Sequence, residues 1–182
     1  MSSKTDYTLK VLNVVSWIIF VGVCIEAGGF ISNSFFTLLL RPVGASKFWT
    51  EVNLSALYNY NQSYYVTVIS LMNIVAVMRA LMFYFIVKIF HDKKLNLSQP
   101  FNETIRRFII KIAYLSLGIG LFSFWGAKYT EGLVSQGVKI PEIQYLRLGG
   151  ADVWLFMGVT LLVIAQIFKK GIELQNENDL TV

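Results

Sequence analysis

Three ionisable residues lie well inside long apolar stretches of this chain: Glu26, Arg79 and Asp152. An ionisable side chain in hydrocarbon is costly and normally faces protein or a water-filled cavity, so each of the three is a candidate functional group. A carboxylate in such a place could carry protons or bind cations. It could equally hydrogen-bond a neighbouring helix, and for Glu26 both interpretations stay open.

The spacing of small residues favours Glu26 among the three. Glu26 lies four residues after Gly22 and three before Gly29, which puts all three on one helix face. Because small residues let membrane helices approach closely, we expect another helix to pack on this face. Arg79 lies about 10 Å from Glu26 in depth at about 1.5 Å per residue. Its guanidinium could pair with Glu26 or reach the cytoplasmic headgroups.

Asp152 follows Gly149 and Gly150 and is expected in the first turn of the last helix. A carboxylate there interacts favourably with the helix dipole, which gives Asp152 a structural role. A second interpretation places Asp152 and Glu26 on either side of an outward-facing cavity that binds a proton or a cation.

The composition gives little support to disulfide, metal, catalytic or nucleic-acid-binding functions. Cys24 is the only cysteine and His91 the only histidine, so an internal disulfide and a multi-histidine metal site are excluded. A nucleophile with a nearby base is not apparent, and we expect a protein that is not an enzyme and has neither metal nor cofactor. The net charge of +5 does not indicate nucleic-acid binding, because the positive residues lie at helix ends.

The apolar stretches that carry these residues define the fold class. They cover about residues 10–40, 63–90, 103–127 and 149–170, and each exceeds the roughly 20 residues that cross a hydrocarbon core. The first is too long for the apolar part of a signal peptide. Asn102 is suited to cap the third helix. We predict an all-α bundle of four transmembrane helices, a single domain over 1–182, with an acidic cytoplasmic tail at 171–182.

The distribution of positive charge predicts the orientation. Ten basic residues flank the two tails and the middle loop: Lys4, Lys10, Lys88, Lys93, Lys94, Arg106, Arg107, Lys111, Lys169 and Lys170. Five lie on the other side: Arg41, Lys47, Lys128, Lys139 and Arg147. By the positive-inside rule both termini are cytoplasmic.

Small residues also predict how the last helix packs. Ala151, Gly158 and Ala165 recur every seven positions and form one stripe along it. Such a stripe is typical of the left-handed packing of membrane helices.

The cytoplasmic side offers a second candidate surface. Its residues are basic in the middle loop and acidic in the tail: Lys93, Lys94, Arg106, Arg107, Glu173, Glu177 and Asp179. The basic group is expected to attract anionic lipid headgroups or a partner protein. The tail could fold against that loop or bind a cytosolic partner, and an oligomer is possible.

The tail also resembles a known family. Residues 168–182 read F-K-K-G-I-E-L-Q-N-E-N-D-L-T-V, which is similar to the chain end of a bacterial family of four-helix membrane proteins of unknown function. Pro100-Phe101 followed by Arg106-Arg107 resembles a second feature of that family. The resemblance implies a bacterial inner-membrane protein. It also implies a small cytosolic helix-turn-helix regulator as partner, since genes of the family often lie beside one for such a regulator.

Two functions follow as hypotheses. The first is a non-enzymatic regulatory or accessory subunit that binds a partner protein at the cytoplasmic face. The alternative is a small proton- or cation-coupled transporter that uses Glu26. Small multidrug exporters also have four helices and a glutamate in the first, but they insert both ways, whereas the charge bias here favours one orientation.

Overall fold

The computed structural model describes residues 3–39, 45, 47–49, 52–92 and 101–179. Its helices are α1 (Ser3–Leu39), α2 (Ser55–Tyr60), α3 (Gln62–His91), α4 (Glu103–Ser135) and α5 (Ala151–Asp179). All but α2 are long and apolar enough to cross a membrane. The described residues contain no strand, only an isolated bridge between Trp49 and Val52. The predicted all-α class with four membrane-spanning helices is confirmed.

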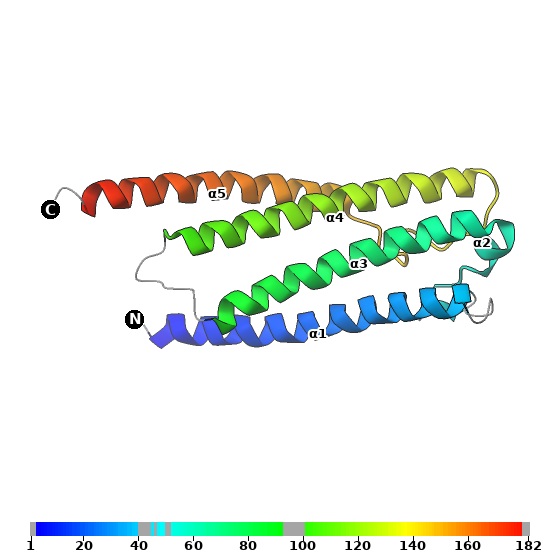
Figure 1. Ribbon diagram of the computed structural model, residues 1–182, viewed down its shortest axis with the longest axis horizontal. Coiled ribbons are helices and arrows are strands. Elements are labelled where there is room, and N and C mark those ends of the chain that lie inside the picture. The colour runs from blue at the N-terminus through cyan, green and yellow to red at the C-terminus, as the bar shows by residue number, and fades with distance from the viewer. Residues whose placement is uncertain (1–2, 40–44, 46, 50–51, 93–100, 180–182) are drawn as a thin grey trace.

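The four long helices form a row in the order α1, α3, α4, α5 (Figure 1). Backbone contacts join α1 to α3, α3 to α4 and α4 to α5, whereas among the described residues α1 and α5 make none with each other. Both termini lie at one end of the row, which we call the terminal end; α2 lies at the opposite, α2 end (Figure 1). α1 and α5 are thus the outer helices, and both carry many exposed apolar side chains.

Asparagine side chains fix where α3 and α4 begin. The Asn61 carboxamide oxygen accepts hydrogen bonds from the backbone N–H groups of Ser63 and Tyr64, at 2.8 and 3.4 Å. The Asn102 oxygen accepts one from Ile105 N–H at 2.9 Å, which confirms the expected cap. These bonds satisfy backbone donors that a helix start leaves unpaired.

Several helices are longer than predicted. α1 begins at Ser3 rather than at residue 10, and residue 40 lies outside the described residues. α4 continues past residue 127 to Ser135, where the Thr130 hydroxyl donates to Gly126 O at 2.9 Å. α5 begins at Ala151 and continues past residue 170 to Asp179, with Lys170 and Glu173 paired at 3.1 Å. The short helix α2 was not predicted, and residues 171–179 of the tail are helical.

Glycines bring α4 and α5 together. A Cβ built on Gly158 would lie 2.6 Å from Leu117 Cγ, and one built on Gly120 would lie 2.7 Å from Leu155 Cγ. Ala165 is buried and Ala151 half-buried on the same stripe of α5. Gly22 is different, because it is exposed and no atom lies within 4 Å of its Cβ position. The expectation that Gly22 packs against another helix is wrong, since its side of α1 is uncovered at that level.

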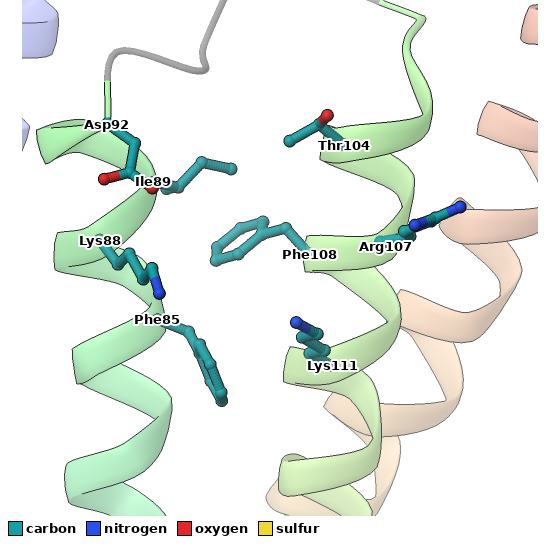
Figure 2. Close-up of a pocket in the computed structure, with 8 residues that line it drawn as sticks. All are labelled: Phe85, Lys88, Ile89, Asp92, Thr104, Arg107, Phe108 and Lys111. Carbon is teal, nitrogen blue, oxygen red and sulfur yellow. The ribbon is translucent and has the colours of Figure 1, made fainter.

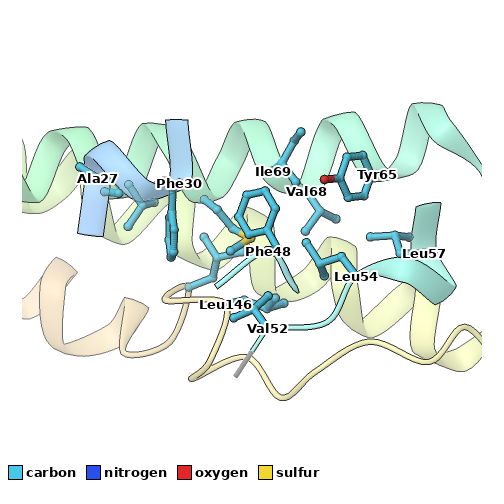
Figure 3. Close-up of a cluster of buried hydrophobic side chains, with 14 of the residues drawn as sticks. Ala27, Phe30, Phe48, Val52, Leu54, Leu57, Tyr65, Val68, Ile69 and Leu146 are labelled. Atoms are coloured by element: carbon cyan, nitrogen blue, oxygen red, sulfur yellow. The ribbon is translucent and has the colours of Figure 1, made fainter. Parts of the chain in front are cut away.

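A buried apolar core closes the α2 end of the row (Figure 3). Phe30 of α1, Tyr65 of α3 and Leu57 of α2 are fully buried there, together with Phe48 and Leu54 from the segment before α2. The segment between α4 and α5 returns toward the middle of the row before α5 begins (Figure 1). Its Leu148 lies against Gly126, although α4 continues to Ser135. This return carries the neighbouring Arg147 deep alongside the bundle.

The packing of α4 on α5 can be tested with one added methyl group. Gly158→Ala should destabilise the protein by about 1–3 kcal/mol, because the new Cβ would overlap Leu117 and would force α4 and α5 apart. Gly22→Ala is the matched control, and alanine's higher helix propensity should leave stability unchanged or raise it by up to about 1 kcal/mol. Thermal unfolding in mild detergent measures both. Equal shifts in the two variants would contradict this account of the interface.

Candidate functional site: a charge cluster

Glu26 of α1 forms an ion pair with Arg147, in which the guanidinium Nε donates to the carboxylate Oε1. The Glu26 side chain is 19% exposed and that of Arg147 is 52% exposed. Arg147 belongs to the segment that precedes α5, between the fully buried Leu146 and Leu148. Its partner was not predicted, since sequence analysis counted Arg147 only as a loop charge.

The backbone at Arg147 is in an unusual conformation. Its φ is +60°, a left-handed value that residues with a side chain adopt uncommonly. Leu148 N–H donates to Ile143 O at 3.2 Å and Arg147 N–H to Gln144 O at 3.1 Å, so the chain turns tightly here. The turn buries both flanking leucines and still leaves the arginine side chain free to reach Glu26. Strained backbone of this kind often marks a functional position.

Arg79 of α3 lies over Trp154 of α5, with the guanidinium carbon 5.5 Å from the ring centroid. This is a cation–π geometry, and it links two helices that make no backbone contact among the described residues. The Arg79 Nε is buried and has no hydrogen-bond partner there. Both Glu26 and Arg147 act electrostatically on Arg79. The three charged groups therefore form one cluster, which we call the charge cluster.

The direction of the Arg79 side chain can be derived from α4. Gly118 lies against Met78, whereas Gly120 lies against Leu155, so residue 154 is nearer the α2 end than residue 79 is. Helix side chains tilt toward the N-terminus, which for α3 is the α2 end. Arg79 therefore reaches toward Trp154 and not toward the terminal end. The contact with Trp154 does not favour the snorkelling interpretation, and a direct Arg79–Glu26 ion pair is not among the contacts of the described residues.

The charge cluster contains one carboxylate and two guanidinium groups. Arg147 neutralises Glu26, and Arg79 leaves an excess positive charge nearby. Removing Arg147 would leave the largely covered Glu26 carboxylate without a counter-charge, and pairs of this kind fix the relative position of the elements that carry them. Here they join α1, α3 and the segment before α5. The same arrangement disfavours cation binding, because two positive groups already surround the carboxylate.

Asp152 lies outside the charge cluster. It is in the first turn of α5 and is exposed. Phe156, Val159 and Val163 are exposed on the same side of α5, whereas Gly158 on the opposite side packs on α4. The position favours the expected interaction with the helix dipole. It does not support a shared cavity with Glu26, whose carboxylate is engaged by Arg147.

Hydrogen bonds and one aromatic ring position α1. The Trp49 ring occupies the space where a side chain at Gly29 would be. We expected another helix to pack on Gly29, and a residue from a loop packs there instead. Asn33 Nδ2 donates to Phe48 O at 2.7 Å. Asn73 Nδ2 of α3 donates to Ser34 Oγ at 2.7 Å. These contacts fix the rotation of α1 and so the direction of Glu26, three residues before Gly29.

The predicted cytoplasmic surface residues gather at the terminal end, except that Lys93 and Lys94 lie outside the described residues. Arg106 and Arg107 both pair with Glu103, at 2.9 and 3.1 Å. Glu173 pairs with Lys170, and Arg106 also acts on it electrostatically. Glu177 is exposed near the end of α5, and Asp179 is the last residue of that helix.

Apolar contacts hold α5 beside the start of α4. Phe101 lies against Gly171, where a Cβ would be 2.5 Å from its ring. The rings of Phe101 and Phe168 are 5.3 Å apart in an edge-to-face geometry. Among the described residues, a group of three or more histidine, cysteine, aspartate or glutamate side chains able to hold a metal is not found, and Cys24 is a free thiol.

A family model for proteins of unknown function, DUF2975, matches residues 49–182. The chain belongs to this family. The match includes Arg79 and Arg147 of the charge cluster, Trp154 below Arg79, and all of the terminal-end residues named above. Glu26, the third member of the cluster, lies before the matched residues. No curated protein and no solved structure matches the chain. Membership of DUF2975 assigns no activity, and the membrane-protein class rests on the four long apolar helices.

The Glu26–Arg147 pair can be tested by a double-mutant cycle. Glu26→Gln should destabilise the protein, because it leaves Arg147 and Arg79 without a counter-charge. Adding Arg147→Gln should recover part of the loss, with a coupling of about 1 kcal/mol. Unfolding in detergent measures each variant.

The control is the exposed Lys128–Glu131 pair of α4. A cycle with Lys128→Gln and Glu131→Gln should give a smaller coupling, because both side chains are in solvent. Additive effects of Glu26→Gln and Arg147→Gln would show that the two side chains act independently.

Proposed function

We propose that this DUF2975 protein is a non-enzymatic regulatory or accessory subunit of the bacterial inner membrane, which binds a cytosolic partner protein at its terminal end. The observation that carries the proposal is the extension of α5. The helix continues from Lys170 to Asp179, and packing on Phe101 keeps it beside α4. A preformed helix outside the apolar part of the chain is suited to recognition because little ordering is left to be done on binding.

The charge of this extension indicates the chemistry of the partner. Glu173 pairs with Lys169 and Lys170 of its own helix. Glu177 is exposed one turn further along α5, and Asp179 is the last residue of the helix. An acidic helix end favours a partner with a basic surface. DNA-binding proteins carry such surfaces, so a cytosolic helix-turn-helix regulator, the partner implied by the family resemblance, would be complementary.

The bias of positive charge toward the terminal end supports a cytoplasmic location for this surface. Lys88, Arg106, Arg107, Lys111 and Lys169 all lie in the described residues of that end. The orientation can be tested in cells with single cysteines in a Cys24→Ala protein. In the Glu177→Cys variant we expect the new cysteine to react only with a membrane-permeant thiol reagent. In the Lys139→Cys variant the new cysteine should react with an impermeant reagent.

Transport through Glu26 has less support than partner binding. The Glu26 carboxylate is held by Arg147 and lies near a second arginine. A proton carrier needs a carboxylate that is released in one state, and these contacts give Glu26 a counter-ion instead.

Partner binding can be tested by pulldown from mild detergent extracts. The full chain should recover a cytosolic protein that a chain lacking residues 171–182 does not recover. Glu177→Lys together with Asp179→Lys should reduce recovery at least tenfold if the acidic end makes the contact. Glu131→Lys with Glu142→Lys, exposed at the other end, is the matched control and should leave recovery unchanged. Recovery of the same proteins by all four chains would contradict the proposal.

A further inference from the structure

A pocket of about 230 Å³ opens between the end of α3 and the beginning of α4 at the terminal end (Figure 2). Its apolar wall consists of Phe85 and Ile89 of α3 and Phe108 of α4. Lys88 of α3 and Lys111 of α4 line it on either side. Its lining residues come from α3, from Asp92 at the end of α3 and from α4, and not from the α5 extension proposed to bind a partner.

The two lysines direct their ammonium groups toward the same space (Figure 2). Lys88 Nζ lies 5.6 Å from the ring centroid of Tyr84, and Lys111 Nζ lies 5.3 Å from that of Phe85. Within the described part of the chain, neither lysine takes part in an ion pair. Two converging ammonium groups without a carboxylate repel each other, and an anion between them would remove that repulsion.

The remaining polar groups of the pocket leave its positive charge in excess. Arg107 is paired with Glu103 and its guanidinium points away from the lysines (Figure 2). Asp92 supplies one carboxylate at the rim, beside Ile89, and Thr104 supplies a hydroxyl from the first turn of α4. One carboxylate does not balance the charges of the two lysines.

The surroundings indicate an anion that carries an apolar chain. Tyr84 and Leu81, one and two turns before Lys88, are exposed on the same side of α3. Tyr114, one turn after Lys111, is exposed on α4. Both rows lead from the lysines toward the middle of the apolar helices, where acyl chains lie. Lysine ammonium groups near the end of membrane-spanning helices are suited to bind a lipid phosphate.

We propose that this pocket binds the phosphate headgroup of an anionic phospholipid between Lys88 and Lys111, with the acyl chains along Tyr84 and Tyr114. The inference concerns a different surface from the partner-binding helix and does not depend on it. It depends on the membrane-spanning helices and on the charges of this one pocket.

Native mass spectrometry of the detergent-purified full chain, titrated with phosphatidylglycerol or phosphatidylcholine, tests the site. We expect the wild-type protein to prefer phosphatidylglycerol. Lys88→Gln with Lys111→Gln should lower that preference roughly 30-fold, at about 1 kcal/mol for each lysine. Lys169→Gln with Lys170→Gln removes the same charge from the same end on α5, and this control should keep the preference.

Three results would overturn the proposal. Equal losses in the two double variants would mean diffuse attraction to the charged end, and no loss in the Lys88/Lys111 variant would place the lipid elsewhere. Displacement of the lipid by millimolar inorganic phosphate would identify a site for free phosphate. If the glutamine variant is unstable, Lys88→Arg with Lys111→Arg retains both charges. That variant should keep the preference, and loss of the preference in a monodisperse arginine variant would also count against the site.

Discussion

A hydrocarbon environment stabilises neither an unpaired backbone group nor an isolated charge, and this constraint underlies the whole structure. Helices satisfy their backbone internally, so four long apolar segments become four helices. The charges that remain within them must find partners from the protein itself. Glu26 pairs with Arg147, and Arg79 lies over the face of the Trp154 ring. Both partners come from the segment that precedes or opens α5, and so the position of this segment follows from the same constraint.

The segment before α5 attaches α1 to the rest of the bundle at a second place. α1 packs on α3 and α5 packs on α4, and among the described residues the two outer helices do not meet. A row of this kind leaves α1 attached along one face only. The segment before α5 supplies a second attachment, because Leu146 is buried in the core of the α2 end while Arg147 pairs with Glu26. Irregular backbone at this depth is tolerated where protein surrounds it, and the buried leucines provide that cover.

Sequence analysis predicts features that depend on nearby residues and misses those that depend on distant ones. Apolar length was sufficient for the four helices, and Asn102 was recognised as a cap because its hydrogen bond is to Ile105. Arg147 was missed because its partner is 121 residues away and the backbone turn that directs it has no sequence signal. Gly29 was assigned to helix packing because spacing cannot show that a tryptophan from a loop would fill the space. The Lys88–Lys111 pocket likewise forms only when two helices come together.

The two ends of the molecule differ in the contacts that hold their polar groups. At the α2 end, hydrogen bonds between distant residues join the elements, as for Asn33 with Phe48 and Asn73 with Ser34, and fully buried side chains such as Tyr65 and Leu57 exclude solvent. At the terminal end, the ion pairs of the described residues are between neighbours on one helix, as for Glu103 with Arg106 and Glu173 with Lys170. Such local pairs contribute little to stability and can exchange partners at small cost. An end built in this way is suited to the two proposed ligands, a lipid phosphate between Lys88 and Lys111 and a basic protein surface against the α5 extension. The buried core of the α2 end meanwhile holds the helices in register.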